Sequence, residues 1–290
     1  MATYATAEPK FVEANGIRFA YLRFGSTSSV TKVPLVCLQH FRGTFDHWDP
    51  ELIDPIATAR EVILIDNSGV GKSGGAVATT YAGWAENVIH IVKALGLGQI
   101  DLFGFSMGGF AAQMVALNHP DFIRRLILGG TGPSAGEGLE AGDSDAFKRL
   151  ATASNDDEEH DGFLSAFYSL TNKKQDTGNT WWSRMTTARS NRSDYLGAEG
   201  TGAQIAAVMR WNDREYASEG SYDRLSEIKI PVLVANGDND ILVPTVNSWV
   251  MFRRLSDAHL HLYPDTGHGF LNEYAAHFSG LINQFLDDEI

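Results

Sequence analysis

A serine between glycines lies where a predicted strand meets a predicted helix. The Gly-x-Ser-x-Gly motif at 104–108 follows the apolar run 100–105 and precedes the helical stretch 107–118. In this context the motif is typical of a nucleophile elbow, whose small residues make room for a strained serine backbone. The following helix directs its positive dipole end toward the oxygen of Ser106. A plain strand-to-helix turn with an N-capping serine is the alternative, and we favour the elbow.

The last third of the chain offers a base for this serine, which needs one within hydrogen-bond reach to act as a nucleophile. His268 lies between two glycines, just after the apolar stretch 259–263. Of the other eight histidines, six fall within predicted helices or strands, at a helix end or in an acidic segment, and His40 and His47 precede the serine in the chain. We therefore predict that His268 is the general base.

An acid to orient that histidine follows another predicted strand, 231–235. The segment Gly-Asp-Asn-Asp at 237–240 contains two candidates, Asp240 and Asp238. Either carboxylate could hold the histidine tautomer, and the other is then a turn residue. We favour Asp240, and the chain order is then serine, acid, histidine, as it would be with Asp238.

Acyl-transfer chemistry also requires donors for an oxyanion. The backbone N–H of Met107, directly after the serine, is the first candidate. The second is predicted in the loop His-Phe-Arg-Gly at 40–43, after the strand 35–39, and we choose the N–H of Phe41. A plain turn between strand and helix is the alternative for this loop.

Composition limits the classes of partner. With 290 residues, 43% of them hydrophobic, the chain can bury a substantial core. Its formal net charge of −13 disfavours nucleic acid and anionic membrane surfaces, so we expect a small-molecule substrate. The single cysteine, Cys37, lies in an apolar run and is predicted to be a buried core residue. The segment 69–73 lacks the spacing of a phosphate loop, and no histidine–carboxylate spacing predicts a metal or other cofactor.

Location and assembly are less constrained by the sequence. The first ten residues have no apolar core of a secretory signal, and no apolar stretch is long enough to span a membrane. We therefore expect a cytoplasmic protein. The oligomeric state stays open, with a homodimer among the alternatives.

Strand and helix patterns alternate along most of the chain. Strands are predicted at 17–24, 35–39, 62–66, 100–105, 125–128, 231–235 and 259–263, with helices at 84–95, 107–118, 247–255 and 274–285. This alternation predicts an α/β fold with a mostly parallel twisted sheet flanked by helices. Residues 133–223 read as helical without strands, and an acidic run at 155–159 is predicted to be a solvated loop or a helix start. The predicted organisation is therefore a core of 1–132 and 224–290 with an inserted helical lid (cap) at 133–223, which lies over the carboxyl ends of the strands. We call residues 133–223 the insertion.

These features together resemble the α/β-hydrolase fold superfamily over nearly the whole chain outside the insertion. The segment 66–73 looks like the family's Asp-x-x-Gly-x-Gly-x-Ser turn, and Thr-Gly-Pro at 131–133 looks like the turn that opens its lid. The oxyanion loop of the family usually reads His-Gly-x-x-Gly, whereas here Phe41 stands at the first glycine and Arg42 follows. The resemblance implies a lidded serine hydrolase.

The expected reaction is hydrolysis of a carboxylic ester, thioester or lactone of a small hydrophobic substrate through an acyl-enzyme. A cofactor-free perhydrolase (haloperoxidase) or a carbon–carbon bond hydrolase would use the same triad, and a non-catalytic receptor on this scaffold is the alternative from another class. Arg42 is expected either at the pocket mouth, meeting a substrate carboxylate, or in solvent. Most of the large apolar residues of the insertion are expected to pack it onto the core, while some could line an apolar acyl pocket, with Trp181 and Trp182 as the named candidates; the others are Phe163, Phe167, Tyr168, Met209 and Trp211.

Overall fold

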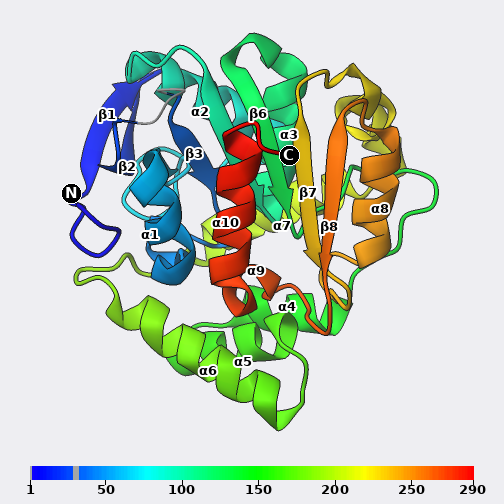
Figure 1. Ribbon diagram of the computed structural model, residues 1–290. Helices are drawn as coiled ribbons and strands as arrows, with labels where there is room; N and C mark the ends of the chain where they lie inside the picture. The colour runs from blue at the N-terminus through cyan, green and yellow to red at the C-terminus, as the bar shows by residue number, and fades with distance from the viewer. Residues whose placement is uncertain (1, 29–32) are drawn as a thin grey trace.

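An eight-stranded sheet forms the centre of the protein in the computed structural model, which describes residues 2–28 and 33–290 (Figure 1). The strand order is β1-β2-β4-β3-β5-β6-β7-β8. Strand β2 pairs antiparallel with both of its neighbours, β1 and β4, and all neighbouring strands from β4 to β8 are parallel. The strands are β1 Lys10–Ala14, β2 Ile17–Gly25, β3 Leu35–Leu38, β4 Glu61–Ile65, β5 Ile100–Phe105, β6 Ile123–Gly129, β7 Val232–Gly237 and β8 Ala258–Tyr263. The predicted α/β class and mostly parallel sheet are confirmed.

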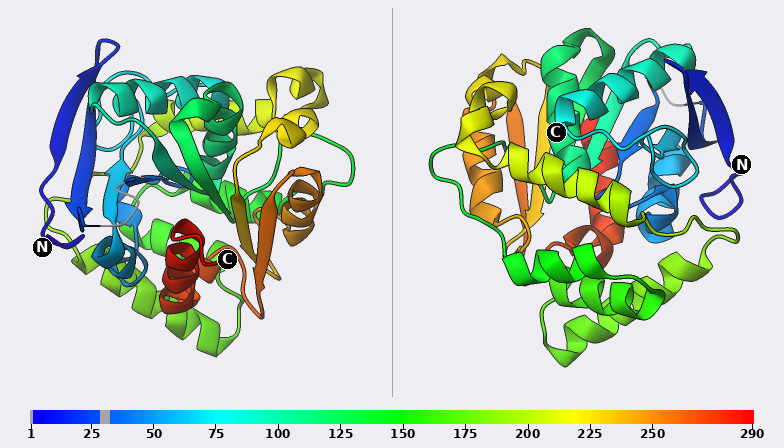
Figure 2. Two further views of the ribbon diagram at one scale, coloured as in Figure 1. Left: turned by 45° about the horizontal axis from the view of Figure 1, so that its top comes forward. Right: turned by 180° about the vertical axis from the view of Figure 1, so that it is seen from behind.

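Helices cover both faces of this sheet. Figures 1 and 2 show α1 and α10 against one face and α2 and α3 against the other, while α8 packs beside β7 and β8. The α-helices are α1 Pro50–Ala59, α2 Tyr81–Ala94, α3 Met107–Asn118, α4 Ser144–Thr152, α5 Asp156–Phe167, α6 Asn172–Thr187, α7 Ala198–Trp211, α8 Thr245–Arg254, α9 Phe270–Glu273 and α10 Ala275–Leu286. Short 3₁₀ helices occupy Phe45–His47, Pro120–Phe122, Arg214–Glu219 and Tyr222–Glu227.

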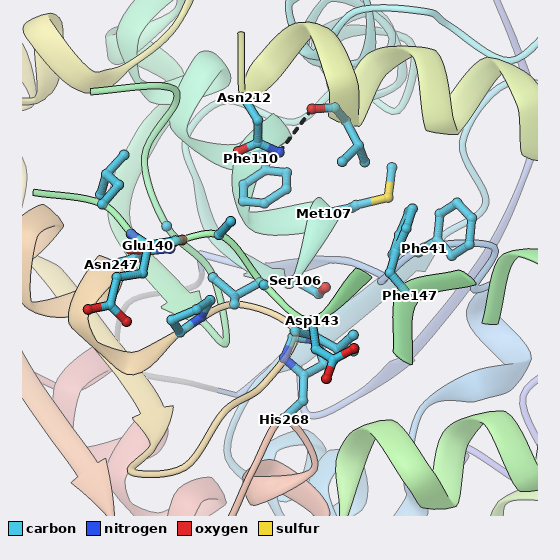
Figure 3. Close-up of a pocket in the computed structure, with 18 of the residues that line it drawn as sticks. Phe41, Ser106, Met107, Phe110, Glu140, Asp143, Phe147, Asn212, Asn247 and His268 are labelled. Atoms are coloured by element: carbon cyan, nitrogen blue, oxygen red, sulfur yellow. Dashed lines mark hydrogen bonds between the residues drawn. The ribbon is translucent and has the colours of Figure 1, made fainter. Parts of the chain in front are cut away.

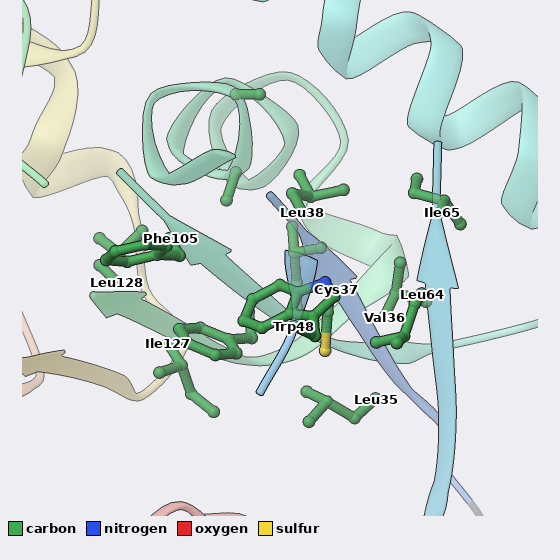
Figure 4. Close-up of a cluster of buried hydrophobic side chains, with 14 of the residues drawn as sticks. Leu35, Val36, Cys37, Leu38, Trp48, Leu64, Ile65, Phe105, Ile127 and Leu128 are labelled. Carbon is green, nitrogen blue, oxygen red and sulfur yellow. The ribbon is translucent and has the colours of Figure 1, made fainter. Parts of the chain in front are cut away.

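The core explains why the central strands read as unbroken apolar runs. Every residue of β3 and β5 is buried, because helices cover both faces of the sheet at these strands. Figure 4 shows Trp48 packed among the side chains of β3, β5 and β6, with Cys37 beside it. Cys37 is fully buried, as predicted, and burial raises the pKa of its thiol well above its usual value.

The insertion enters the fold after β6 and returns to the sheet at β7. Its described residues form α4 to α7 and no strand. Figures 1 and 2 show α4, α5 and α6 across the end of the sheet toward which the arrowheads of β6 and β7 point. Side chains at the carboxyl ends of the parallel strands therefore face the insertion.

The sequence predictions for local structure are confirmed for all seven strands and for the helices outside the insertion, with small shifts at the ends. The acidic run is a helix start, since Asn155 caps α5 and Asp156 begins it. Strand β1 and helices α1 and α9 were not predicted from the sequence. Helix α1 was not predicted because it starts at Pro50 and contains Pro55, and these prolines interrupt an otherwise helical sequence pattern. No helix among the described residues is long and apolar enough to cross a membrane.

Candidate active site

Ser106 occupies a strained turn between β5 and α3. Its backbone has φ 55° and ψ −121°, a conformation that costs a non-glycine residue free energy and that the surrounding structure must impose. Its N–H donates to the Gly129 carbonyl of β6 at 2.8 Å, and α3 begins at the next residue. The side chain caps no helix N–H, so the N-cap alternative does not describe its role. The hydroxyl is therefore free to face the cavity at the end of the sheet.

The glycines around Ser106 are required by close backbone contacts. A Cβ at Gly104 would collide with the backbone of Gly108, and a Cβ at Gly108 would collide with the Leu38 carbonyl of β3. These contacts bring the start of α3 against the ends of β3 and β5. The sequence spacing of the elbow thus follows from packing rather than from loop flexibility.

We expect Gly108→Ala to destabilise the fold by about 1–3 kcal/mol, because a backbone carbonyl cannot move aside for the added methyl group. Urea denaturation of both variants checks the prediction. Gly98→Ala is the matched control, since a Cβ at Gly98 meets no heavy atom within 4 Å. Equal midpoints for the two variants would contradict the steric explanation.

The structure brings His268 and Asp240 together beneath the insertion. His268 Nδ1 lies 2.6 Å from Asp240 Oδ2, and both side chains are almost fully buried. A carboxylate can only accept, so Nδ1 carries the proton and Nε2 is left as the basic nitrogen. Nε2 is buried and has no hydrogen-bond partner among the described residues. Asp240 is itself fixed, because its Oδ1 accepts from the N–H groups of Leu242 and Val243 at 2.8 and 2.9 Å.

Asp238, the rival acid, faces away from this pair. It is exposed, and its Oδ1 accepts from the Thr266 N–H at 3.2 Å and from the Asn239 side chain at 2.9 Å. Asp238 therefore links the turn after β7 to the loop that contains Thr266 and His268. Of the two carboxylates, the structure places Asp240 on the histidine.

Two backbone N–H groups are available at the cavity beside Ser106. Met107 is the first residue of α3, and Phe41 follows β3 in the loop 40–43. Neither N–H donates a hydrogen bond to another described residue. Both residues line the same cavity as Ser106 and His268 (Figure 3). An oxyanion formed at Ser106 would find two unpaired donors there.

The cavity holds about 480 Å³. Figure 3 shows Phe41, Met107 and Phe147 on one side of Ser106 and Glu140 and Asn247 on the other. Most of the lining side chains are apolar. They come from loops of the core, from α3, from the segment 132–144 and from α4, α5 and α7; the large apolar members are Phe41, Met107, Phe110, Leu139, Phe147, Leu150, Phe163, Phe167, Val208, Leu242 and Val243.

Comparison with known proteins identifies the family. The family model described as the alpha/beta hydrolase fold matches residues 33–273. This chain belongs to the α/β-hydrolase family. An α/β-hydrolase fold protein from Chitinophaga pinensis has a similar structure, with a TM-score of 0.88, 32% identity and 99% of each chain covered.

Relatives with assigned activities are more distant hydrolases. A 2-hydroxy-6-oxononadienedioate/2-hydroxy-6-oxononatrienedioate hydrolase of Burkholderia vietnamiensis is 28% identical over 240 residues, covering 81% of this chain and 79% of the relative. A proline iminopeptidase of Lactobacillus delbrueckii subsp. bulgaricus is 24% identical over 298 residues, covering 92% and 96%. The chain is thus an α/β-hydrolase-fold hydrolase whose relatives cleave different bonds.

His40 is a site residue of this hydrolase that was not predicted from the sequence. Its ring lines the cavity and packs edge-on against Phe105, Phe163 and Phe167. Burial lowers the pKa of His40 to about 4, so the ring is neutral near pH 7. Its Nδ1–H donates to the Phe41 carbonyl at 2.9 Å, which restrains the loop 40–43. The signal was available, because His40 opens that loop in the sequence.

Both expectations for Arg42 are wrong. Its side chain is neither at the pocket mouth nor in solvent: only 5% of the residue is exposed, and it does not line the cavity of Ser106. The guanidinium donates to the backbone carbonyls of Leu150, Ala153 and Leu196 at 2.8 to 3.1 Å. The left-handed backbone at Arg42, with φ 59°, turns the side chain under the insertion.

Trp181 and Trp182 also lie away from the cavity, contrary to their prediction as lining residues. Both are on α6, which packs behind α5. Trp181 contacts Phe163 and Phe167, and these two α5 residues are the ones that face the cavity. Sequence pattern identified the aromatic residues of the insertion but could not tell which of its layers faces the site.

Glu159 of α5 is buried beside Arg42, and burial raises the pKa of its carboxyl from the usual 4.5 to about 8, an effect that Arg42 partly offsets. The folded protein therefore binds more protons here than the unfolded chain between these two pH values. We expect the Glu159 contribution to the free energy of unfolding to fall as pH rises from about 4.5 to 8. Urea titrations across this range should show a weaker decline for Glu159→Gln.

The neighbouring Glu158 provides the control for that measurement. It is exposed, and hydrogen bonds from Ser154 lower the pKa of its carboxyl. Glu158→Gln should leave the decline between pH 4.5 and 8 in place. An unchanged pH profile in Glu159→Gln would show that Glu159 is already ionised in the folded protein.

Among the residues that the structure describes, no group of three or more His, Cys, Asp or Glu side chains is arranged to hold a metal ion.

Proposed function

We propose that this hydrolase is a serine hydrolase that cleaves a small hydrophobic carboxylic ester, thioester or lactone through an acyl-enzyme. The observation that carries the proposal is the buried Asp240–His268 pair in the same cavity as Ser106. A histidine held in one tautomer, with its other nitrogen unpaired, is the arrangement that activates a serine hydroxyl. The strained backbone of Ser106 supports the same role.

In the proposed mechanism, His268 Nε2 takes the hydroxyl proton as Ser106 Oγ attacks the acyl carbon. The negative charge that develops on the carbonyl oxygen is met by the N–H groups of Phe41 and Met107. The imidazolium, stabilised by Asp240, gives its proton to the leaving alcohol, thiol or ring oxygen. Water then attacks the acyl-enzyme, His268 takes the water's proton, and that proton returns to Ser106 as the acid leaves.

The lining of the cavity supports a hydrophobic, uncharged acyl group. Apolar side chains surround Ser106, and His40 is neutral. The exposed carboxylates of Glu140 and Asp143 lie at the rim, where they would repel an anionic substrate. Arg214 is the one Lys or Arg among the described lining residues, and its guanidinium donates to the Gly136 carbonyl. In this proposal the insertion acts as a lid over the acyl group.

A carbon–carbon bond hydrolase is the second candidate, because the Burkholderia relative is named for cleavage of a dienedioate. Such a substrate carries two carboxylates. The cavity disfavours binding of a dicarboxylate. The Arg42 guanidinium donates to backbone carbonyls and does not face the cavity, and the carboxylates at the rim would repel the substrate. An ester substrate fits this electrostatic environment better. A perhydrolase would use the same residues, with peroxide in place of water in the second step.

A fluorophosphonate probe tests the proposal directly. We expect the probe to label the wild-type protein at Ser106, as mass spectrometry of the labelled peptide would show. A non-catalytic receptor on this scaffold would stay unlabelled. A panel of p-nitrophenyl esters of increasing acyl length, each measured with and without hydrogen peroxide, separates esterase from perhydrolase. Faster turnover of a dienedioate than of every ester in the panel would contradict the preference for esters.

A further inference from the structure

The peptide between Phe41 and Arg42 is held at both of its polar atoms. Its carbonyl oxygen accepts from His40 Nδ1–H at 2.9 Å, and its N–H donates to Gln204 Oε1 at 2.7 Å. The first contact comes from the loop itself, whereas Gln204 lies on α7 of the insertion and is 1% exposed. A buried hydrogen bond on each side leaves this peptide plane one orientation. The Phe41 N–H belongs to the preceding peptide, which is joined to this one through the Cα of Phe41. Holding the 41–42 peptide therefore limits how the Phe41 N–H can turn.

The Arg42 side chain makes a second connection from the same residue. Its guanidinium donates to Leu150 of α4, to Ala153 just after α4 and to Leu196 just before α7. It also stacks on Tyr195, with its central carbon 4.9 Å from the ring centre. The loop 40–43, the predicted oxyanion loop, is therefore hydrogen-bonded to two parts of the insertion, the end of α4 and the segment before α7.

These contacts offset a conformation that the loop would not keep unaided. Arg42 has φ 59°, and a left-handed conformation costs a non-glycine residue about 1–2 kcal/mol. The contacts that stabilise it belong almost entirely to the insertion. Without them, the loop would relax and the N–H of Phe41 would lose its direction. The position of the insertion and the completeness of the oxyanion site are thus physically linked.

We propose that Gln204 and Arg42 are positioning residues that hold the Phe41 N–H toward the cavity, so that the oxyanion site is complete only while the insertion rests on the loop. This inference rests on the proposed serine hydrolase function. Neither residue touches the substrate, since neither lines the cavity of Ser106. Their effect should therefore appear in the chemical step and not in substrate binding.

Gln204→Met tests the inference, because methionine has a similar length and no strong acceptor. With p-nitrophenyl butyrate we expect kcat to fall about 10- to 100-fold, which is no more than the decrease caused by removing one oxyanion donor. KM should stay within about threefold of the wild-type value. Butylboronic acid, which forms a tetrahedral adduct on serine, should bind weaker by a similar factor. Gln204→Glu keeps an acceptor oxygen and should restore most of kcat.

Arg184→Gln is the matched control. Arg184 of α6 joins the insertion to Asp49, the N-cap of α1, in a bidentate ion pair with distances of 2.8 and 2.6 Å, and its guanidinium contacts Asp49 and Glu51 but no residue of the loop 40–43. Its loss should lower the melting temperature and leave kcat within about twofold. Arg42→Lys is a second test variant, since lysine keeps the charge but cannot reach all three carbonyls; it should lower kcat in the same way.

The outcomes separate this inference from the function on which it rests. A wild-type protein that is labelled at Ser106 while Gln204→Met and Arg42→Lys both keep full kcat would overturn the positioning role alone. Equal losses of kcat in Gln204→Met and Arg184→Gln would also overturn it, since general loosening of the insertion would then explain both. Failure of the wild type to react with the probe would instead overturn the serine hydrolase proposal.

Discussion

Ser106→Ala should lower kcat/KM for ester hydrolysis by about 10⁴-fold or more, because in the proposed mechanism Ser106 Oγ forms the acyl-enzyme. The expected loss is chemical and not structural. Alanine keeps the Cβ of the strained turn, and the hydroxyl that it removes caps no helix. The variant should therefore fold normally, with a melting temperature within a few degrees of the wild type, and should show no fluorophosphonate labelling. Initial rates with p-nitrophenyl esters provide the measurement.

A second serine serves as the control for this change. Ser144 lines the same cavity at the start of α4 but is exposed, and it is no part of the buried Asp240–His268 pair. Ser144→Ala should keep activity within about twofold. Activity retained in Ser106→Ala would point to another nucleophile. Cys37 could not take that place, because it is fully buried in the core and the pKa of its thiol is raised.

The parts of the site that sequence could predict are those attached to strand ends. In a parallel sheet the carboxyl ends of β3, β5 and β7 meet at one edge, so residues that follow those strands are brought together by the fold. Ser106 follows β5 directly, and Asp240 and His268 follow β7 and β8 within a few residues. The local sequence pattern was sufficient because each residue needed only to follow its own strand, and the parallel sheet then places the ends of these strands side by side.

Side-chain direction was the part that local pattern could not supply. Arg42 contacts carbonyls more than a hundred residues away, and nothing near it in sequence shows that α4 and α7 will lie over it. The layer order of α5 and α6, which puts Phe163 in the cavity and Trp181 behind it, is likewise decided by packing between helices. Such contacts depend on the assembled insertion.

The choice between the two aspartates shows the same limit at short range. Asp238 and Asp240 are two residues apart in a turn, and an aspartate suits a turn at either position. The turn directs one carboxylate outward to the Thr266 N–H and the other inward to His268. Chain order was compatible with both, and only the backbone path between β7 and α8 separates them.

Asp240→Asn should lower kcat by about 10³- to 10⁴-fold with the fold intact, by reversing the histidine tautomer. The reversal follows from the hydrogen bonds at this position. The N–H groups of Leu242 and Val243 require an acceptor, so the amide oxygen of asparagine would stay at the place of Oδ1. The amide NH₂ would then face His268 Nδ1, which must accept. The proton moves to Nε2, and the ring cannot take the proton of Ser106.

Asp238→Asn is the matched change in the same turn. Its exposed side chain can still accept from the Thr266 N–H through the amide oxygen, so kcat should stay within about threefold. Steady-state rates for the two variants, with circular dichroism to establish that both are folded, make the comparison. A larger loss in Asp238→Asn than in Asp240→Asn would mean that the acid reaching His268 during catalysis is not the one that contacts it in this structure. Because the two substitutions are chemically identical, the difference between them measures position alone.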